Sequence, residues 1–333
     1  MNTRYTDEQV RFAAKLYYVD GVNQSGVARL VQVSQAKVSR LLAVARERGI
    51  VRISVDDYEP RNGDLEKGLR DAFDLGVAIV VKTAPNAPGE VVRATVGHIG
   101  AQYVSPLIPD SGVLAIAGGR AVRELAGRLP ERDGRRLAIV QAMGSIDSSV
   151  GTEDAIELGR SLVQRWGGFF MTLSTPAFVP NKRTRDSFLA FRQIQAVWER
   201  FTRANAALVG IGAMEASAFV ARGVLTAQDI DELKKRGATG EICGRFFDRN
   251  GDECDTPWRE RVISIGLDAL RRIPQVVAVV PGAGRAHAVA AAIRGRLIKT
   301  LVIDEDGARA LLAIKPARGA GKSTSGTSGK TKR

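Results

Sequence analysis

The sequence predicts an α/β protein with a small helical module at the N-terminus and a large domain built on a mainly parallel sheet. From Asp64 onward, short apolar segments of strand length alternate with helix-length mixtures of polar and apolar residues. This alternation is typical of a parallel sheet covered by helices on both faces. A chain of 333 residues with 44% hydrophobic content is long enough for one large core and a small module.

The N-terminal module has the spacing of two short helices that cross at a turn. A first helix in "TDEQVRFAAKLYYVDG" is expected to begin after Thr6, which can cap it. In the following two helices, Ala28 must be small at the crossing, and Ser34 is a good cap for the second. Gln32 occupies the turn, where glycine is common because the backbone is often left-handed. The segment "GIVRISV" (49–55) is expected to form a short strand or wing. The apolar or small positions that we expect to share one buried face are Val27, Ala28, Val31, Val33, Val38 and Leu41.

The helix after Ser34 exposes side chains that suit a DNA groove. Gln, Lys, Ser and Arg are side chains that reach base edges and phosphates in the major groove. The alternative interpretation is an ordinary helical hairpin with a polar face. We therefore predict that DNA is contacted by Ser34, Gln35, Ala36, Lys37, Ser39 and Arg40.

Seven apolar segments of the large domain are predicted strands. Ligands of such sheets bind outside the carboxyl ends of the strands, where loops and helix N-termini converge. The predicted strands are residues 77–81, 113–117, 137–141, 169–173, 206–211, 276–280 and 300–304.

Glycine-rich loops follow several of these strands and predict one ligand pocket. They are "AGGR" (117–120), "MGSIDS" (143–148), "STPAF" (174–178), "GIGAME" (210–215) and "PGAGRAH" (281–287). Glycines allow backbone amides to approach an anion closely, and arginines can pair with a phosphate. A tight strand-to-helix turn also favours glycine, so each loop alone is weak evidence. We assign ligand contacts to Gly118, Gly119, Arg120, Gly144, Gly212, Glu241, Asp248, Gly282 and Arg285.

Positive charge is concentrated at the two ends of the chain. Residues 1–53 carry a net charge of +5 and residues 315–333 a net charge of +6, out of +13 for the whole chain. This distribution indicates a polyanionic partner, most simply nucleic acid. The segment "GAGKST" (319–324) resembles the phosphate-binding loop of a nucleotide hydrolase, but Pro316 replaces the opening glycine and no apolar periodicity follows. We interpret residues 316–333 as a disordered basic tail.

Composition argues against several other functions. Two cysteines, Cys243 and Cys254, are too few for a disulfide framework or a zinc site, and His98 and His287 are the only histidines. We expect no metal and no cofactor. No apolar segment is long enough to span a membrane, and no signal-like segment opens the chain. We therefore expect a cytoplasmic protein. Asn250 and Gly251 in "FFDRNGDECD" predict a tight hairpin turn rather than a calcium loop.

The order of motifs along the chain resembles the SorC (DeoR/SorC) family of bacterial sugar-responsive transcriptional regulators. The motifs are "VSQAKVSRLLAVARERGIVRISV", "ALVGIG", "GATGEICGRFFDRNGDE", "RVISIGLDALRRIPQVVAVVPGAG" and "AAAIRGRLIKTLVIDEDGARALL". The resemblance covers about Thr6 to Leu312. It implies a winged helix-turn-helix at 1–55, a linker at 56–63 and an effector domain at 64–315. That domain is expected to be Rossmann-like and similar to glucosamine-6-phosphate deaminase and ribose-5-phosphate isomerase. The resemblance also implies operator DNA as a partner, a sugar, sugar-phosphate or polyol effector, and a homotetramer or homodimer.

This chain departs from the family pattern in two loops of the pocket. Where the family has a Gly-x-Ser-Trp-Gly-x-Thr loop, the chain has Ala115, Ala117, Gly118, Gly119 and Ala121. In "PGAGR", Arg285 replaces the family's lysine. The effector can therefore be a sugar phosphate, an unphosphorylated polyol or a different acid. The alternative function is an isomerase or deaminase with an added DNA-binding module, and we expect a regulator without enzymatic activity because no motif arranges an acid–base set.

Overall fold

The computed structural model describes residues 5–53, 58–132, 134, 136–146 and 150–314. The chain divides into two compact units, which are Met1–Glu59 (unit 1) and Pro60–Arg333 (unit 2). The basic tail predicted at 316–333 lies outside the described residues. Among the described residues, no helix is both long and apolar enough to cross a membrane.

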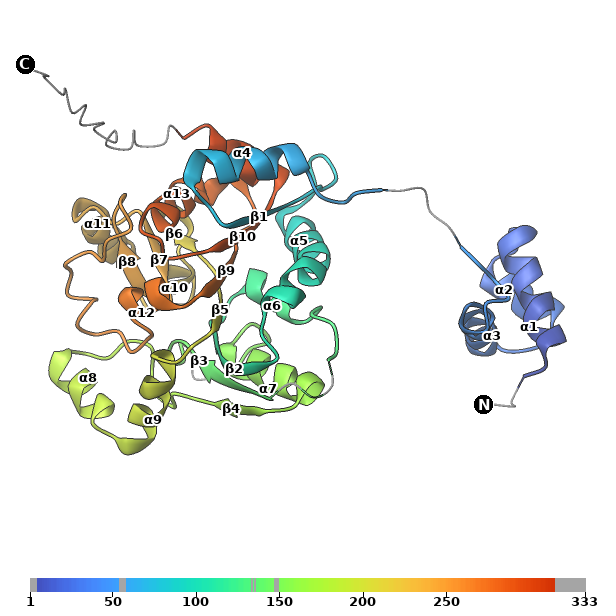
Figure 1. Cartoon of the computed structure of the whole chain (residues 1–333), viewed down its shortest axis with the longest axis horizontal. Coiled ribbons are helices and arrows are strands. Elements are labelled where there is room, and N and C mark those ends of the chain that lie inside the picture. The colour runs from blue at the N-terminus through green and yellow to red at the C-terminus, as the bar shows by residue number, and fades with distance from the viewer. Residues whose placement is uncertain (1–4, 54–57, 133, 135, 147–149, 315–333) are drawn as a thin grey trace, which may run out of the picture. The chain divides into compact units, whose positions relative to one another are not determined.

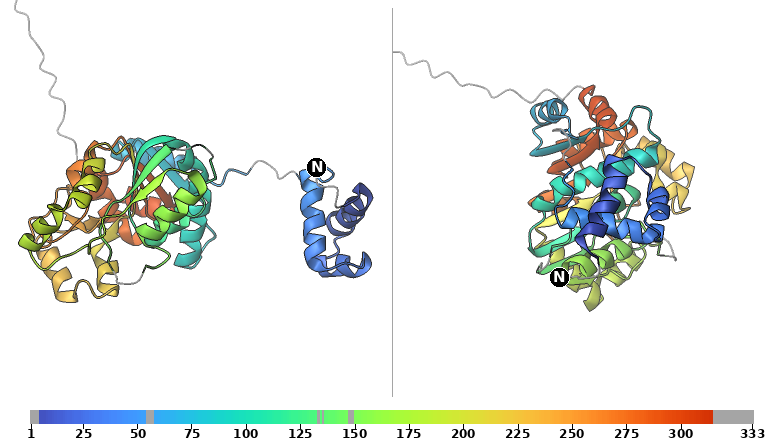
Figure 2. Two further views of the ribbon diagram at one scale, coloured as in Figure 1. Left: turned by 90° about the horizontal axis from the view of Figure 1, so that it is seen from below. Right: turned by 90° about the vertical axis from the view of Figure 1, so that its right-hand side faces the viewer.

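The described residues of unit 1 form three α-helices with polar caps. They are α1 (Asp7–Ala14), continued by a π-helical turn (Lys15–Val19), α2 (Gln24–Leu30) and α3 (Gln35–Glu47). Thr6 and Gln9 form a capping box at α1, Asn23 Oδ1 accepts the Gly26 N–H at 2.8 Å, and Ser34 Oγ accepts the Lys37 N–H at 3.2 Å. Each cap satisfies a backbone donor that the helix itself leaves unpaired. The left panel of Figure 2 shows the three helices packed against one another.

The core of unit 1 confirms the predicted helix-turn-helix packing. Val27, Ala28, Val38 and Leu41 are buried together with Val10 and Ala13 of α1, whereas Val31 and Val33 are only half-buried. Gln32 has a φ of 54°, so the turn before α3 is left-handed without a glycine. The expected wing is not formed by its described residues, because 49–53 make turns and an irregular segment without a strand; residues 54 and 55 are outside the described part.

Unit 2 is built on a seven-stranded sheet in which every pair of neighbouring strands is parallel. The spatial order is β1-β10-β9-β5-β2-β3-β4. All seven predicted strands are present. Their bounds are β1 (Val77–Val81), β2 (Ser111–Ile116), β3 (Arg136–Gln141), β4 (Phe169–Met171), β5 (Ala206–Val209), β9 (Gln275–Val279) and β10 (Thr300–Asp304).

Helices cover both faces of this sheet, as the strand alternation predicted (Figure 1). One face packs against α5 (Gly89–Val104), α6 (Arg120–Ala126) and α7 (Ala155–Trp166). The other face packs against α4 (Gly63–Phe73), α9 (Arg192–Phe201), α12 (Leu267–Arg272), α13 (Ala286–Arg294) and α14 (Glu305–Leu312). Successive strand residues alternate between the two cores, with Ile79 and Val81 in one and Ala78 and Val80 in the other. This period of two is the geometry of a pleated strand.

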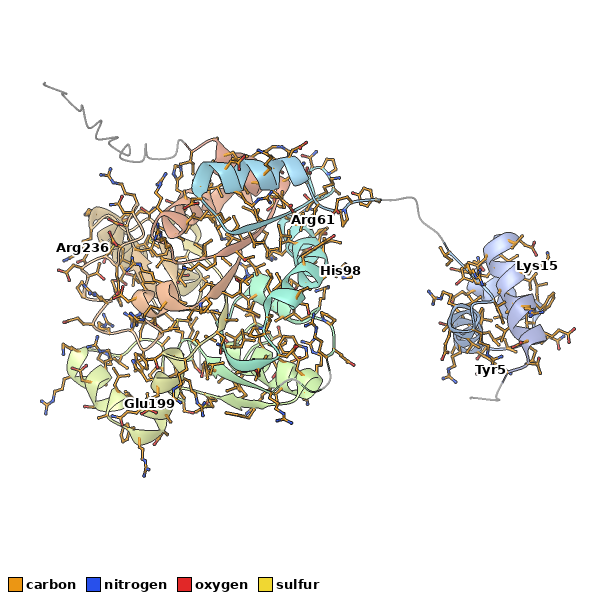
Figure 3. The ribbon with its side chains drawn as sticks, viewed as in Figure 1. Tyr5, Lys15, Arg61, His98, Glu199 and Arg236 are labelled. Atoms are coloured by element: carbon orange, nitrogen blue, oxygen red, sulfur yellow. The ribbon has the colours of Figure 1, made fainter. Side chains whose placement is uncertain are left out.

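A small antiparallel sheet and further helices complete unit 2. The sheet is β6 (Gly212–Ala213), β7 (Gly240–Ile242) and β8 (Arg245–Phe247). After β8 the chain turns tightly at Asn250 and Gly251, as predicted, and Gly251 has a φ of 83°. His98 lies exposed on α5 (Figure 3). The remaining helices are α8 (Lys182–Leu189), α10 (Ala218–Ala221), α11 (Ala227–Lys235) and 3-10 turns at Ser105–Leu107, Met214–Ala216 and Ala283–Arg285.

Residues 60–62, which were expected in the linker, run beside β1. The Asn62 N–H donates to Val80 O at 2.8 Å, and the Lys82 N–H donates to Pro60 O at 2.9 Å. The Arg61 guanidinium holds the Glu66 carboxylate at 2.5 and 2.8 Å, and it lies 4.3 Å from the centroid of the Tyr103 ring. Figure 3 shows Arg61 where the chain enters unit 2. Unit 2 therefore begins with an anchored segment.

Candidate functional site

A cavity of about 380 Å³ opens at the carboxyl ends of the central strands. From β2 the chain continues outward through β3 and β4, whereas β5, β9 and β10 continue toward the opposite edge. The order of strands therefore reverses between β2 and β5, which is where ligands of open α/β sheets bind. The volume is within the range of small-molecule sites. The loops after β2, β3, β5 and β9, with the residues that adjoin them, line the cavity. They contribute residues 117–122, 141, 143–146, 210–212, 279–281 and Arg285.

The glycines of these loops allow the walls to pack closely. A Cβ atom on Gly118 would lie 2.9 Å from Glu153 O, and one on Gly144 would lie 2.5 Å from Pro176 O. Real side chains do not fit at such distances from backbone atoms, so both positions require glycine. These two glycines therefore allow close packing between loops. Close packing is the structural reason for glycine that was considered as the alternative to a ligand contact.

Three arginines converge on the cavity from different elements. Arg120 begins α6, Arg285 follows β9, and Arg93 comes from α5. Burial lowers the pKa of the Arg285 guanidinium, and the positive charges of Arg120 and Arg93 lower it further. Arg285 donates to Pro281 O at 3.0 Å, whereas Arg93 and Arg120 form no hydrogen bond or ion pair with any residue that the structure describes. The guanidinium groups of this cluster therefore have hydrogen-bond donors available, and they repel one another. An anionic ligand would accept from these donors and relieve the repulsion.

A carboxylate faces this cluster. Glu241 on β7 lines the cavity, and its Oε2 accepts the Gly244 N–H at 2.9 Å. Burial raises the pKa of Glu241 to about 7, while the hydrogen bond from Gly244 and the charge of Arg285 oppose this shift. A Cβ atom on Gly212 would lie 2.3 Å from Glu241 Oε1, so this glycine makes room for the carboxylate. A carboxylate accepts hydrogen bonds from ligand hydroxyl groups when it is ionised.

An ion pair connects two sides of the cavity. The Arg222 guanidinium, just after α10, contacts the Glu153 carboxylate at 2.8 Å and the Asp154 carboxylate at 3.5 Å. Burial alone would raise the pKa of Glu153, but the hydrogen bond and charge of Arg222 hold it below its usual value. This pair neutralises Arg222, so the positive end of the cavity is the cluster formed by Arg93, Arg120 and Arg285.

The structure brings most of the predicted ligand-binding residues together. The predicted residues that line the cavity are Gly118, Gly119, Arg120, Gly144, Gly212, Glu241 and Arg285. Gly282 lies in the same loop as Arg285 but does not line the cavity, and its φ of 93° explains why it is glycine.

Asp248 is not placed in the cavity. Its Oδ1 accepts the N–H groups of Asn250 and Asp252 at 2.8 and 3.0 Å, so the carboxylate stabilises the hairpin turn after β8. Aspartate commonly takes this role in tight turns.

Sequence reasoning missed several polar and charged residues of the cavity, among them Arg93, Gln141, Glu153 and Arg222. Arg93 lies inside a helix and Gln141 ends a strand, so neither belongs to a glycine loop. Glu153 and Arg222 carry no local motif. Their place in the site depends on contacts between distant segments. In the described residues, no group of three His, Cys, Asp or Glu side chains is placed to hold a metal ion.

The predicted DNA-recognition residues lie at the start of α3. Ser34 caps the helix, and Gln35, Ala36, Ser39 and Arg40 are exposed, which leaves their side chains accessible. Lys37 is half-buried, and its ammonium lies 5.9 Å from the centroid of the Tyr5 ring. An ammonium at this distance is attracted by an aromatic face.

Unit 1 has an exposed helix after a tight turn, and unit 2 is an α/β domain with a ligand cavity. This combination is the architecture of a ligand-responsive DNA-binding regulator. The family model "Putative sugar-binding domain" matches residues 60–313, and the chain belongs to this family.

Known regulators are similar over nearly the whole chain. The sorbitol operon regulator of Klebsiella pneumoniae is 29% identical over 309 residues, which cover 90% of this chain and 96% of the relative. The deoxyribonucleoside regulator of Bacillus subtilis strain 168 is 28% identical over 306 residues, with coverage of 90% and 96%. The crystal structure of the full-length sorbitol operon regulator SorC from Klebsiella pneumoniae superposes with a TM-score of 0.70 at 28% identity and covers 92% of this chain and 100% of that one. The predicted family, fold class and role as a SorC-type transcriptional regulator are confirmed.

Proposed function

We propose that the cavity of unit 2 binds an anionic derivative of a sugar or polyol, and that this effector controls how α3 binds operator DNA. The observation that carries the proposal is the convergence of Arg93, Arg120 and Arg285 on one cavity at the switch point of the sheet. Relatives named for a sorbitol operon and for deoxyribonucleosides support a small hydroxylated effector.

The two ends of the cavity suit two parts of such an effector. Guanidinium groups bind a phosphate or carboxylate through paired hydrogen bonds, so the arginine cluster is expected to hold the anionic group. Glu241 is expected to accept hydrogen bonds from hydroxyl groups. The effector contacts that we propose are those of the seven predicted lining residues together with Arg93.

At the DNA, we propose that Gln35, Ala36, Ser39 and Arg40 face the major groove, with Ser34 and Lys37 at its edge. Side chains at the start of a recognition helix contact base edges. We also propose a homodimer or homotetramer acting in the cytoplasm, because a two-fold assembly places two α3 helices on half-sites about 34 Å apart. The named relatives are transcriptional regulators, which favours binding over catalysis.

Two measurements test this proposal. Selection from a random DNA library, followed by light scattering of the complex, identifies the operator and the number of chains bound. Thermal unfolding is then measured with matched sets of a sugar or polyol, its phosphate and its aldonic acid. A ligand that binds only the folded state raises the melting temperature. We expect stabilisation by a phosphate or carboxylate member and a change in affinity for the selected DNA. Stabilisation by the neutral members alone would contradict the anionic assignment, and turnover of a ligand would support the enzyme alternative.

A further inference from the structure

The first residues of unit 2 contact a helix from the other end of the chain. Asn62 caps α4, because its Oδ1 accepts the Leu65 N–H at 3.1 Å. Its Nδ2 donates to Glu305 Oε1 at 2.7 Å. Glu305 begins α14, and Figure 1 shows this C-terminal helix, in red, beside α4. The side chain of Asn62 therefore joins the beginning of unit 2 to α14.

The residue before Glu305 joins α14 to the loop of the cavity. Asp304 ends β10 and is 2% exposed. Its Oδ1 accepts the Gly282 N–H at 2.5 Å, and its Oδ2 accepts the Gly307 N–H at 3.2 Å. Gly282 lies between Pro281 and Arg285, which both line the cavity. One buried carboxylate thus holds the cavity loop and caps α14.

We propose that Asp304, Glu305 and Asn62 are positioning residues that couple the loop 281–285 to the residues where the chain enters unit 2. The proposal concerns regulation of the effector site and so rests on the function proposed above. Residues 60–62 directly follow the segment that leads from unit 1. A change at Arg285 is therefore transmitted to this connection through two short hydrogen-bonded steps.

The physical reason is the cost of breaking these bonds separately. The folded protein loses stability when a buried acceptor such as the Asp304 carboxylate loses a hydrogen-bond donor that nothing replaces. Movement of the Gly282 backbone is therefore followed by Asp304, and α14 moves with the carboxylate that caps it. Asn62 follows because Glu305 is the first residue of that helix. This coupling has to be demonstrated by perturbing the loop 281–285 and measuring the response at Asn62.

Exchanging the donor and the acceptor of the Asn62–Glu305 hydrogen bond tests this coupling separately from the role of Asn62 as the cap of α4. Asn62→Asp keeps an acceptor for the Leu65 N–H but loses the donor to Glu305. Glu305→Gln keeps an acceptor for the Asn62 amide, so it is the conservative control. The double variant Asn62→Asp/Glu305→Gln has a donor and an acceptor again, in reversed direction. The Arg61–Glu66 pair remains in all variants and anchors the segment independently.

The test perturbs the loop at Gly282 and measures the response at Asn62 and Leu65, in the absence of effector and DNA. Gly282→Ala strains the loop, because the φ of 93° is unfavourable for alanine. Hydrogen–deuterium exchange of the full chain then reports the amides of Asn62 and Leu65. We expect Gly282→Ala to accelerate their exchange by about tenfold in the wild-type and Glu305→Gln backgrounds. The response should be absent with Asn62→Asp and return in the double variant.

The proposal is overturned if Gly282→Ala accelerates exchange equally with Asn62→Asp, has no effect in the wild type, or is not rescued in the double variant. Because the experiment contains neither ligand nor DNA, its result is independent of whether the proposed effector class is correct. A negative ligand screen with a positive exchange result would contradict only the proposed function.

Discussion

Replacing Glu241 by glutamine should change how the stability of unit 2 depends on pH. The pKa of this carboxyl is 4.5 in an unstructured chain and about 7 in the folded protein, chiefly because of burial. Between these values the folded state binds a proton that the unfolded state has released. The free energy of unfolding therefore falls as the pH rises through this range and levels off above about pH 7. Glutamine occupies nearly the same volume and does not titrate.

The size of the effect follows from the two pKa values. Ionisation of Glu241 costs the folded state about 3 kcal/mol in total, at about 1.4 kcal/mol for each pKa unit. Roughly 2 kcal/mol of this cost appears between about pH 5.5 and about pH 8. The difference in stability between Glu241→Gln and the wild type should therefore increase in favour of the variant by about 2 kcal/mol over this interval.

Urea unfolding followed by tryptophan fluorescence measures this difference. The three tryptophans, Trp166, Trp198 and Trp258, all lie in unit 2, so the signal reports this unit alone. Glu260→Gln, at an exposed position, is the matched control and should follow the wild type at both pH values. If Glu241→Gln and the wild type differ by the same amount at both pH values, the carboxyl is not desolvated as the structure indicates.

Further predictions concern the DNA, the effector and the tail. Gln35→Ala should relax base preference by about 1–3 kcal/mol, whereas Arg40→Ala should weaken binding to all sequences alike if it contacts phosphate; unchanged affinities of both variants at moderate salt would show that α3 is not the recognition helix. Arg285→Ala should weaken effector binding by roughly ten- to a hundredfold in calorimetry without reducing operator affinity, because a charge-assisted hydrogen bond is lost; normal effector binding would remove Arg285 from the site. Deletion of residues 319–333 should lower nonspecific DNA affinity and reduce its salt dependence, since fewer counterions are released, and an unchanged salt slope would contradict this role of the basic tail.

The sequence was sufficient for features that depend on neighbouring residues. Each of the seven sheet strands is an apolar segment bounded by polar or glycine-rich residues, and the two sheet faces follow from alternation along the strand. Gln32, recognised as an unusual turn residue, has the expected left-handed backbone. Cap residues such as Ser34 act within a single helical turn, so their role could also be predicted.

Features that depend on distant segments were decided by the tertiary structure. Nothing near Arg93 indicates that its helix places it beside Arg120 and Arg285, and the strand order that brings them together is not written in any local pattern. Asp248 was expected in the site, yet its carboxylate is occupied by its own turn.

The sequence by itself thus determined the strands of the large sheet, the family and the likeness of the N-terminal unit to a helix-turn-helix. Only the tertiary structure decided which charged side chains face one cavity, and that Asp304, Glu305 and Asn62 connect its loop to the start of unit 2. The physical reason is range. Hydrogen bonding within a turn and apolar periodicity act over a few residues, whereas desolvation and charge interactions depend on which segments pack together in space.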